Sequence, residues 1–401
     1  MSMETAAPAT AGTEYTYSLN LDRTQFTGDF SIADFEEVVR LAFQLWSVVA
    51  DIDFIEVSDN RDVRTHIDVA TTSDPVSSAD STWGRPGGIL GFGGVNSQRF
   101  AWMDDAETWA PFGEGRDSNY FLVAAHEIGH AIGIFDHIEG GLQLMNARIG
   151  SQEGIYQGDI DAVIRLYGAR EWSNDAETID LSFVKAAQTV QARGGNDTII
   201  ATTLADTLHG GAGNDTINGD DGNDRIYDSL GSNTVSGGNN NDVIIGGAGR
   251  TEASGDNGSD IIIGGKGDDR LDGGRGNDSI RGDANSSFFH GDDVITAGPG
   301  TDYLEGGGGA DTFVFRPNEG TNTIAELRIT ANNPGNTSTV GTDFEPGVDM
   351  IDVRAFGYSS RAEAFGNVSD VNGNARFADQ GTVIVFQGLG LIDLSESDFI
   401  V

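Results

Sequence analysis

A short stretch near residue 130 carries two histidines and a glutamate at a spacing that could do chemistry. Residues 126–137 read His-Glu-Ile-Gly-His-Ala-Ile-Gly-Ile-Phe-Asp-His. On a helix, His126 and His130 lie one turn apart on the same side, so both imidazoles can bind one zinc ion. Glu127 is then placed to act as general base on a water molecule, and Gly133 can take the left-handed conformation that ends the helix. The spacing therefore predicts a catalytic zinc site on this helix.

This motif resembles the metzincin signature HExxHxxGxxH, and residues 123–131 are similar to matrixins and serralysins in particular. The resemblance implies a metalloendopeptidase whose third zinc ligand lies three residues after Gly133. That position is Asp136, as in the snapalysin variant, whereas His137 fits only with a one-residue insertion in the turn. We favour Asp136 as the third ligand and keep His137 as the alternative, because a carboxylate and an imidazole both suit zinc.

Two further features resemble metzincins. The family carries a methionine beneath the metal, and Met145 is the candidate here, with a structural role and no part in the reaction. Residues 88–91 resemble the edge strand that binds an extended peptide by main-chain hydrogen bonds. The resemblance therefore implies that Ile89, Leu90 and Gly91 contact the substrate.

The elements that position these residues follow from the spacing of apolar side chains. Helical spacing occurs over residues 31–50, 119–133 and 159–167, and strand-like runs occur at residues 53–57, 66–70 and 100–103. The zinc motif falls on the second of these helices. We therefore expect an α+β metzincin catalytic domain at residues 15–170.

From about residue 196 the chain becomes periodic. Stepping by nine from Asp197 gives thirteen positions that are almost all aspartate, and an apolar residue follows each after one intervening residue. The phase breaks once, by six extra residues around 284–289. Each unit reads as a glycine turn, a carboxylate and a very short strand, which predicts an all-β parallel β-roll at residues 190–401. The candidate calcium ligands are Asp215, Asp224, Asp242, Asp260, Asp269, Asp278, Asp302 and Asp311.

The repeat resembles the RTX nonapeptide GGxGxDxUx, most clearly at residues 210–218, 264–272, 273–281 and 306–314. The resemblance implies several structural calcium ions between neighbouring turns, so folding is expected to depend on calcium. The copies centred on Asn233 and Thr251 depart from the pattern. The chain ends Asp-Phe-Ile-Val, which resembles the C-terminal signal of proteins exported by type I secretion.

Composition narrows the possible partners. The 401 residues include 63 acidic and 23 basic ones, giving a net charge of −40, and no cysteine. A phosphate-binding surface needs a basic field, so nucleic acid is not expected as a partner. Disulfides and thiolate metal sites are excluded, and no stretch approaches the length of a membrane span. Residues 1–16 lack the basic and apolar regions of a secretory signal peptide.

Together these features predict a secreted, extracellular, monomeric endopeptidase with one catalytic zinc ion and a calcium-stabilised roll, acting on protein or peptide substrates. The alternative is a catalytically inactive RTX protein that serves calcium-dependent binding or adhesion. The alternative requires loss of a ligand or of the base, and His126, Glu127 and His130 are all present.

Overall fold

The computed structural model divides the chain into two compact units. The N-terminal unit holds residues 1–171 and 183–186, and the roll unit holds residues 172–182 and 187–401. The structure describes residues 13–20, 32–57, 66–72, 91–95, 99–104, 109–110, 118–132, 134, 144, 154–284, 291–328, 338–341 and 343–401.

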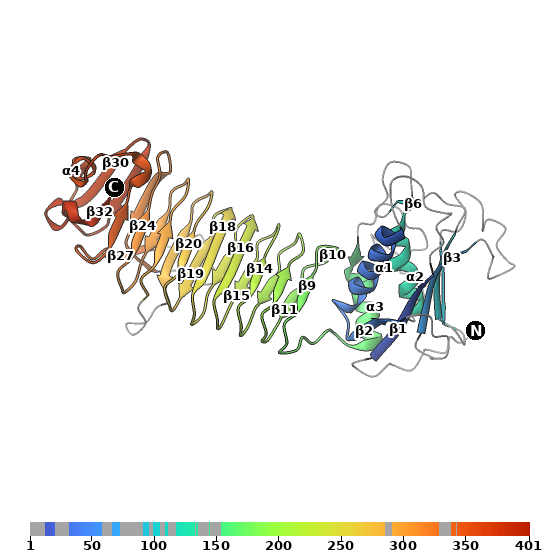
Figure 1. The fold of residues 1–401 in the computed structure, drawn as a ribbon. Coiled ribbons are helices and arrows are strands. Elements are labelled where there is room, and N and C mark those ends of the chain that lie inside the picture. Colours follow the sequence, from blue (N-terminus) through green and yellow to red (C-terminus); the bar gives the residue numbers. More distant parts are fainter. Residues whose placement is uncertain are drawn as a thin grey trace. The chain divides into compact units, whose positions relative to one another are not determined.

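A five-stranded sheet with the order β2-β1-β3-β5-β4 forms one layer of the N-terminal unit (Figure 1). The first four strands in that order run parallel, and β4 pairs antiparallel with β5 at one edge. The strands are β1 (Thr13–Asn20), β2 (Ile52–Glu56), β3 (His66–Thr72), β4 (Gly91–Val95) and β5 (Arg99–Asp104).

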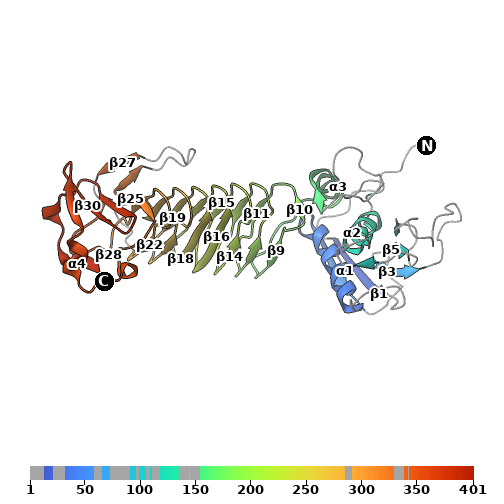
Figure 2. The same ribbon diagram turned by 90° about the horizontal axis from the view of Figure 1, so that it is seen from above.

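Helices α1 (Ile32–Ser47) and α2 (Tyr120–Ala131) pack side by side against this sheet (Figure 2). The Trp46 indole of α1 is fully buried and donates a hydrogen bond to the Ala125 carbonyl of α2 at 2.8 Å. Each helix lies where the apolar spacing predicts it, with ends that differ by one to three residues from the predicted 31–50 and 119–133. The metal-motif helix is thus held from both sides inside the unit.

The third helix, α3 (Gln157–Tyr167), ends at Gly168 and closes against the end of α2. Tyr167 donates its hydroxyl hydrogen bond to the Ile132 carbonyl, and the Tyr15 hydroxyl lies 2.9 Å from the same phenol oxygen. Short parallel pairs complete the unit, namely β6 (Trp109–Ala110) with β7 (Ser118–Asn119) and β8 (Ile155–Tyr156) with β10 (Val184–Lys185).

The roll unit consists of two sheets whose strands are contributed alternately along the chain (Figure 1). Most strands have three residues, and the middle side chain points into a narrow core, as Ile199, Ile217 and Ile226 do at 0–1% exposure. Ile199 pairs with Ile217, 18 residues later, so one turn of the roll contains two nonapeptides. The predicted fold class, an α+β domain followed by a parallel β-roll, is confirmed.

The stacked strands of the roll belong to a first and a second sheet. The first sheet contains β9 (Thr178–Asp180), β12 (Thr198–Ile200), β14 (Thr216–Asn218), β16 (Asn233–Asn239), β18 (Thr251–Asn257), β20 (Arg270–Asp272), β22 (Val294–Thr296), β24 (Thr312–Val314), β28 (Met350–Asp352) and β32 (Phe399–Ile400). The second begins with β11 (Thr189–Gln191), β13 (Thr207–His209), β15 (Arg225–Tyr227), β17 (Val243–Ile245), β19 (Ile261–Gly265), β21 (Ser279–Asp283), β23 (Tyr303–Glu305) and β25 (Gly320–Ile324).

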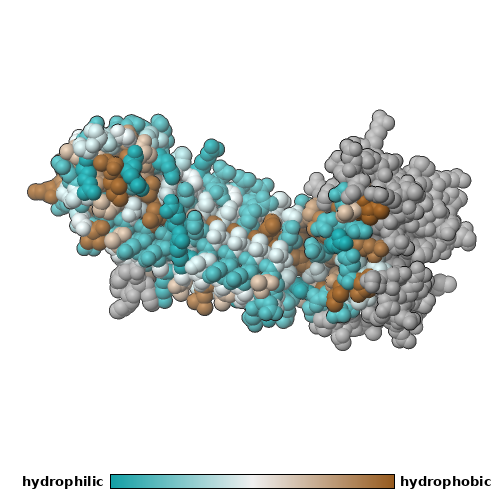
Figure 3. Space-filling model, viewed as in Figure 1, coloured by the Kyte–Doolittle hydropathy of each residue, from teal (hydrophilic) through white to brown (hydrophobic). Residues whose placement is uncertain are grey.

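A cap ends the roll. The second sheet continues through β31 (Thr382–Phe386), β30 (Asn374–Asp379) and β29 (Val368–Val371), and the last two pairings are antiparallel. The cap core is aromatic, and the surface along the roll is mainly hydrophilic (Figure 3), although Leu204 and Leu230 are exposed there. On the cap, Val371 and Ile392 are exposed. The cap also holds α4 (Arg361–Phe365), the hairpin β26 (Glu326–Arg328) with β27 (Ser338–Gly341), and short 3-10 turns at Arg354–Phe356, Leu391–Asp393 and Glu396–Asp398.

Within the part of the chain that the structure describes, no helix has both the length and the apolar composition that crossing a bilayer requires.

Candidate metal centres

Helix α2 brings the two histidines of the zinc motif together as the spacing predicts. The rings of His126 and His130 lie 4.7 Å apart between centroids, at an interplanar angle of 89°. His126 is 5% exposed, and nearly every residue of this helix from Phe121 onward is buried. The pair therefore lies inside the unit at one end of a closely packed helix.

Both imidazoles are oriented by backbone carbonyls. His126 Nδ1 lies 2.8 Å from the Leu144 carbonyl, and His130 Nδ1 lies 2.7 Å from the Ile134 carbonyl. A carbonyl oxygen only accepts, so Nδ1 is the donor in both rings, and in the neutral imidazole Nε2 is then the nitrogen that can bind a metal ion. A zinc-binding histidine requires this arrangement, in which the second ring nitrogen is fixed by a hydrogen bond. The residues present fit a zinc ion.

Glu127 follows His126 directly on α2 and is 5% exposed. A carboxylate is seldom buried this deeply unless it pairs with a partner or takes part in chemistry. Its position beside the first histidine matches the place predicted for the general base.

Asp159 supports the site from α3, and the sequence analysis did not single it out. This carboxylate is fully buried, and its Oδ2 accepts the backbone N–H of Leu144 at 2.7 Å and of Tyr156 at 3.0 Å. Leu144 thus donates to Asp159 through its nitrogen and accepts from His126 through its oxygen. The position of Asp159 in the first turn of α3 was visible in the sequence, but its contact 15 residues back along the chain was not.

The remaining predicted residues of this site lie largely outside the described residues. Among the described residues, no group of three or more His, Asp or Glu side chains gathers around a point suited to a metal ion. Gly91 begins the edge strand β4. Outside the described part lie Gly133, Asp136, His137, Met145, Ile89 and Leu90.

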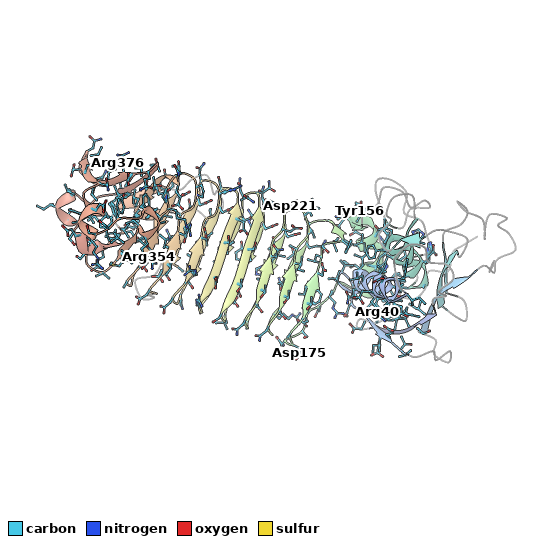
Figure 4. All side chains as sticks on the ribbon, turned by 45° about the horizontal axis from the view of Figure 1, so that its top comes forward. Arg40, Tyr156, Asp175, Asp221, Arg354 and Arg376 are labelled. Atoms are coloured by element: carbon cyan, nitrogen blue, oxygen red, sulfur yellow. The ribbon has the colours of Figure 1, made fainter. Side chains whose placement is uncertain are left out.

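In the roll, the repeat aspartates line two rows. We name the loops leading into the first sheet the first edge and those leading into the second sheet the second edge; Asp175 and Asp221, labelled in Figure 4, mark opposite edges. Each repeat aspartate uses Oδ1 to accept the backbone N–H of the residue one turn earlier. Asp242, for example, accepts from Asp224 at 2.8 Å. The predicted calcium residues are 0–2% exposed.

The second carboxylate oxygen has a different environment. In seven of the eight predicted calcium residues, Oδ2 is buried without a hydrogen-bond partner. An unpaired buried carboxylate oxygen is costly, so the arrangement calls for a cation. The Oδ2 atoms of Asp197 and Asp293 are likewise buried without a hydrogen-bond partner. The seven are Asp215, Asp224, Asp242, Asp260, Asp269, Asp278 and Asp311.

The space beside these oxygens is kept open by glycine. A Cβ atom on Gly255 would lie 2.4 Å from Asp260 Oδ2 and 2.6 Å from the Gly273 carbonyl oxygen of the next loop on that edge. Gly264 is placed in the same way, 2.3 Å from Asp269 Oδ2 and 2.7 Å from the next loop's carbonyl oxygen. Carboxylate and carbonyl oxygens facing a small open space are the ligands that calcium prefers. These residues fit calcium.

Burial also changes the acidity of these groups. Burial, with a smaller contribution from neighbouring carboxylates, raises the pKa of Asp224 to about 7 and that of Asp260 to about 8. Burial also raises the pKa of Asp293 to about 8. At neutral pH the row therefore needs a positive counter-charge to hold its carboxylates ionised.

Two second-edge aspartates differ from the rest. The backbone N–H and the hydroxyl of Thr202 both donate to Asp206 Oδ2, at 2.9 and 2.8 Å. The Asn322 amide, with its nitrogen turned toward the carboxylate, donates to Asp302 Oδ2 at 2.8 Å. Protein donors thus satisfy both oxygens of the predicted calcium residue Asp302.

Comparison with known families supports both halves of this description. Residues 11–168 match the matrixin model of family M10 peptidases. Four copies of the RTX calcium-binding nonapeptide repeat match residues 191–226, 218–251, 254–288 and 291–314.

Similar proteins include interstitial collagenase of Sus scrofa, 30% identical over 41% of this chain and 34% of the collagenase. Neutrophil collagenase of Homo sapiens is 31% identical over 36% of this chain and 31% of its own length. The hatching enzyme of Paracentrotus lividus is 29% identical over 38% of this chain and 26% of its own length. The chain thus spans about a third of the length of these relatives. Residues 11–168 belong to the matrixin peptidases, and the chain continues from them into RTX calcium-binding nonapeptide repeats.

Proposed function

We propose that this protein is a secreted zinc-dependent endopeptidase whose RTX roll is stabilised by calcium. The observation that carries the proposal is the pair His126 and His130, each with Nδ1 bound to a backbone carbonyl, beside the buried Glu127. The match of residues 11–168 to the matrixins supports the same activity.

His126 and His130 would hold the zinc through Nε2, and Asp136 or His137 would complete the set. Zinc, when bound, supplies Lewis acidity to the peptide carbonyl and to a water molecule. Glu127 takes the proton of the attacking water and later delivers it to the leaving amine.

The substrate side of the proposal rests on the edge strand. β4 lies at the edge of the five-stranded sheet, so an extended peptide can add to it by main-chain hydrogen bonds. We propose that Ile89, Leu90 and Gly91 bind the substrate backbone, with Gly133 and Met145 shaping the turn and the floor of the site.

Export is the remaining part of the proposal. We assign the final residues Asp398–Val401 to recognition by a type I secretion machinery, with the protein acting outside the cell as a monomer. In the folded cap Asp398 and Phe399 are buried, at 1% and 0% exposure. The machinery would therefore contact this segment before the roll folds, and calcium outside the cell would then drive folding.

Casein hydrolysis by the wild type and by Glu127→Ala, with and without a zinc chelator in excess calcium, tests the peptidase proposal. We expect Glu127→Ala to lower the rate by about 10²–10⁴-fold, because the general base is lost. Chelation of zinc should abolish the wild-type rate. Equal hydrolysis by both variants would contradict the proposal, and a wild type without activity in saturating zinc would favour the calcium-dependent binding protein.

A further inference from the structure

Asp228 is a buried carboxylate that the repeat pattern does not explain. It opens the first-edge loop 228–233, where the regular repeat has glycine, and Asn233 closes the same loop, where the regular repeat has aspartate. The loop therefore still holds one carboxylate, but at its first residue instead of its last. Asn233 keeps the backbone role of the missing aspartate, because its Oδ1 accepts the Asp215 N–H at 2.8 Å.

The carboxylate of Asp228 lies where the regular turns place a backbone oxygen. In the second-edge loop 219–224, a Cβ on Gly219 would meet the next loop's Gly237 carbonyl oxygen at 2.3 Å and Asp224 Oδ2 at 2.7 Å. In the first-edge loop 210–215, a Cβ on Gly210 would meet Asp215 Oδ2 at 2.8 Å and Asp228 Oδ1 at 3.2 Å. A side-chain oxygen has thus entered the space between these two turns.

Both carboxylates that border this space have an unsatisfied oxygen. Asp228 is 6% exposed and Asp215 is 2% exposed. Asp228 Oδ1 accepts the Ser229 N–H at 2.7 Å, whereas Oδ2 of Asp228 and Oδ2 of Asp215 have no hydrogen-bond partner. Two buried carboxylates so close together repel each other unless a cation lies between them.

We propose that Asp228 is a calcium ligand that shares one ion with Asp215 between loops 210–215 and 228–233. This inference rests on the proposed calcium-binding function of the roll and adds a ligand outside its repeat. The Asp228 carboxylate takes the ligand position that a backbone carbonyl oxygen occupies in the regular turns. The site therefore carries two negative charges instead of one. A higher ligand charge tightens calcium binding.

The next departure along this edge has the opposite result. The Thr251 hydroxyl donates to the Gly264 carbonyl oxygen at 3.2 Å, so that carbonyl already has a partner within the protein. Asn233 and Thr251 also begin the two seven-residue strands of the first sheet, β16 and β18, which pair with each other directly from these two residues onward. Protein hydrogen bonds thus hold this part of the edge, and Asp228 ends the calcium row that precedes it.

Calcium stoichiometry and affinity, measured on the full-length protein by equilibrium dialysis with calcium chloride, test the inference. We expect Asp228→Asn to bind one of its calcium ions at about tenfold lower affinity than the wild type, because the carboxylate charge is removed, and Ser229→Ala, an exposed neighbour in the same loop, to bind like the wild type. Because both carboxylates serve one ion, the double variant with Asp215→Asn should lose no more than Asp215→Asn alone.

Asp228→Gly provides a second variant, with the glycine that neighbouring loops carry. It should keep the ion at about tenfold lower affinity, since one charge is removed. Circular dichroism in saturating calcium verifies that each variant is folded. Full stoichiometry and unchanged affinity in both Asp228 variants, or an additional ion lost in the double variant, would overturn the inference. Asp224→Asn, on the other edge, separates the two proposals. If Asp224→Asn binds as much calcium as the wild type and with the same affinity, the proposed calcium role of the roll is wrong instead.

Discussion

The chemistry of the N-terminal unit depends on which nitrogen of each histidine carries a proton. The HExxH spacing predicted that His126 and His130 share a helix face, and it identified Glu127 between them. It could not predict the carbonyls of Leu144 and Ile134 that hold the rings. Those contacts depend on how the chain folds back after the helix, which local spacing does not encode. Asp228 escaped the sequence analysis for the same reason, since its neighbour is Asp215 of the previous turn.

Asp159→Ala should weaken zinc binding without removing a ligand. The buried carboxylate fixes the Leu144 backbone that orients His126, and loss of such an outer partner typically costs about 10–100-fold in metal affinity. The affinity can be measured by competition with a zinc indicator in excess calcium. Asp161→Ala is the matched control, because Asp161 lies on the same helix and is exposed. Equal zinc affinity in the two variants would show that Asp159 does not position His126.

At the scale of elements, regular stretches were predictable and irregular ones were not. The roll followed from a nine-residue period, because each repeat forms its own turn and strand and contacts only the adjacent turns. The three helices that the structure describes in the N-terminal unit also lie at the predicted places. Strand β1 (Thr13–Asn20) and the antiparallel strands of the cap were not predicted, since each is defined by pairing with distant segments.

Alanine substitutions should distinguish the glycines whose turn has no room for a Cβ atom from those whose turn can accommodate one. Gly276 has φ +144°, and a Cβ there would lie 1.3 Å from the Gly258 carbonyl oxygen. We expect Gly276→Ala to raise the calcium concentration needed for folding, because the turn cannot close without displacing its neighbour. In Gly194→Ala the nearest atom is 3.4 Å away, so that variant should fold like the wild type. Calcium titrations followed by circular dichroism compare the two, and an equal midpoint for both variants would contradict this account.

At the scale of the whole molecule, a net charge of −40 is concentrated in part in two rows of buried aspartates. Burial raises the pKa of Asp278 to about 7 and that of Asp302 to about 8, whereas the pKa of an aspartate in the unfolded chain is about 3.9. The folded roll therefore holds protons that the unfolded chain releases. The resulting stability is complete below about pH 4 and is lost as the pH rises through about 7–8.

Two pH dependences follow. With a calcium chelator present, the roll should lose ordered structure as the pH rises from about 5 to about 9. With calcium present, the midpoint of folding should move to lower calcium concentration over the same range, because calcium replaces bound protons. Circular dichroism at a series of pH values measures both trends. A calcium midpoint independent of pH would mean that the aspartates are already ionised before calcium binds.

The 18-residue turn of the roll also limits how such a chain can change in length during evolution. Ile199, Ile217 and Val235 occupy one sheet at successive turns, and the cap extends the two sheets differently, with β32 on one and β29–β31 on the other. Loss of one nonapeptide would transfer every later strand to the opposite sheet and present the cap with its two sheets exchanged. Loss or duplication of a nonapeptide pair would leave the register intact. The six extra residues around 284–289 leave the strands in phase, since the backbone N–H of Asp269 still donates to Asp293 Oδ1, 24 residues later. In rolls of this kind, evolution should therefore favour the insertion or deletion of nonapeptides in pairs.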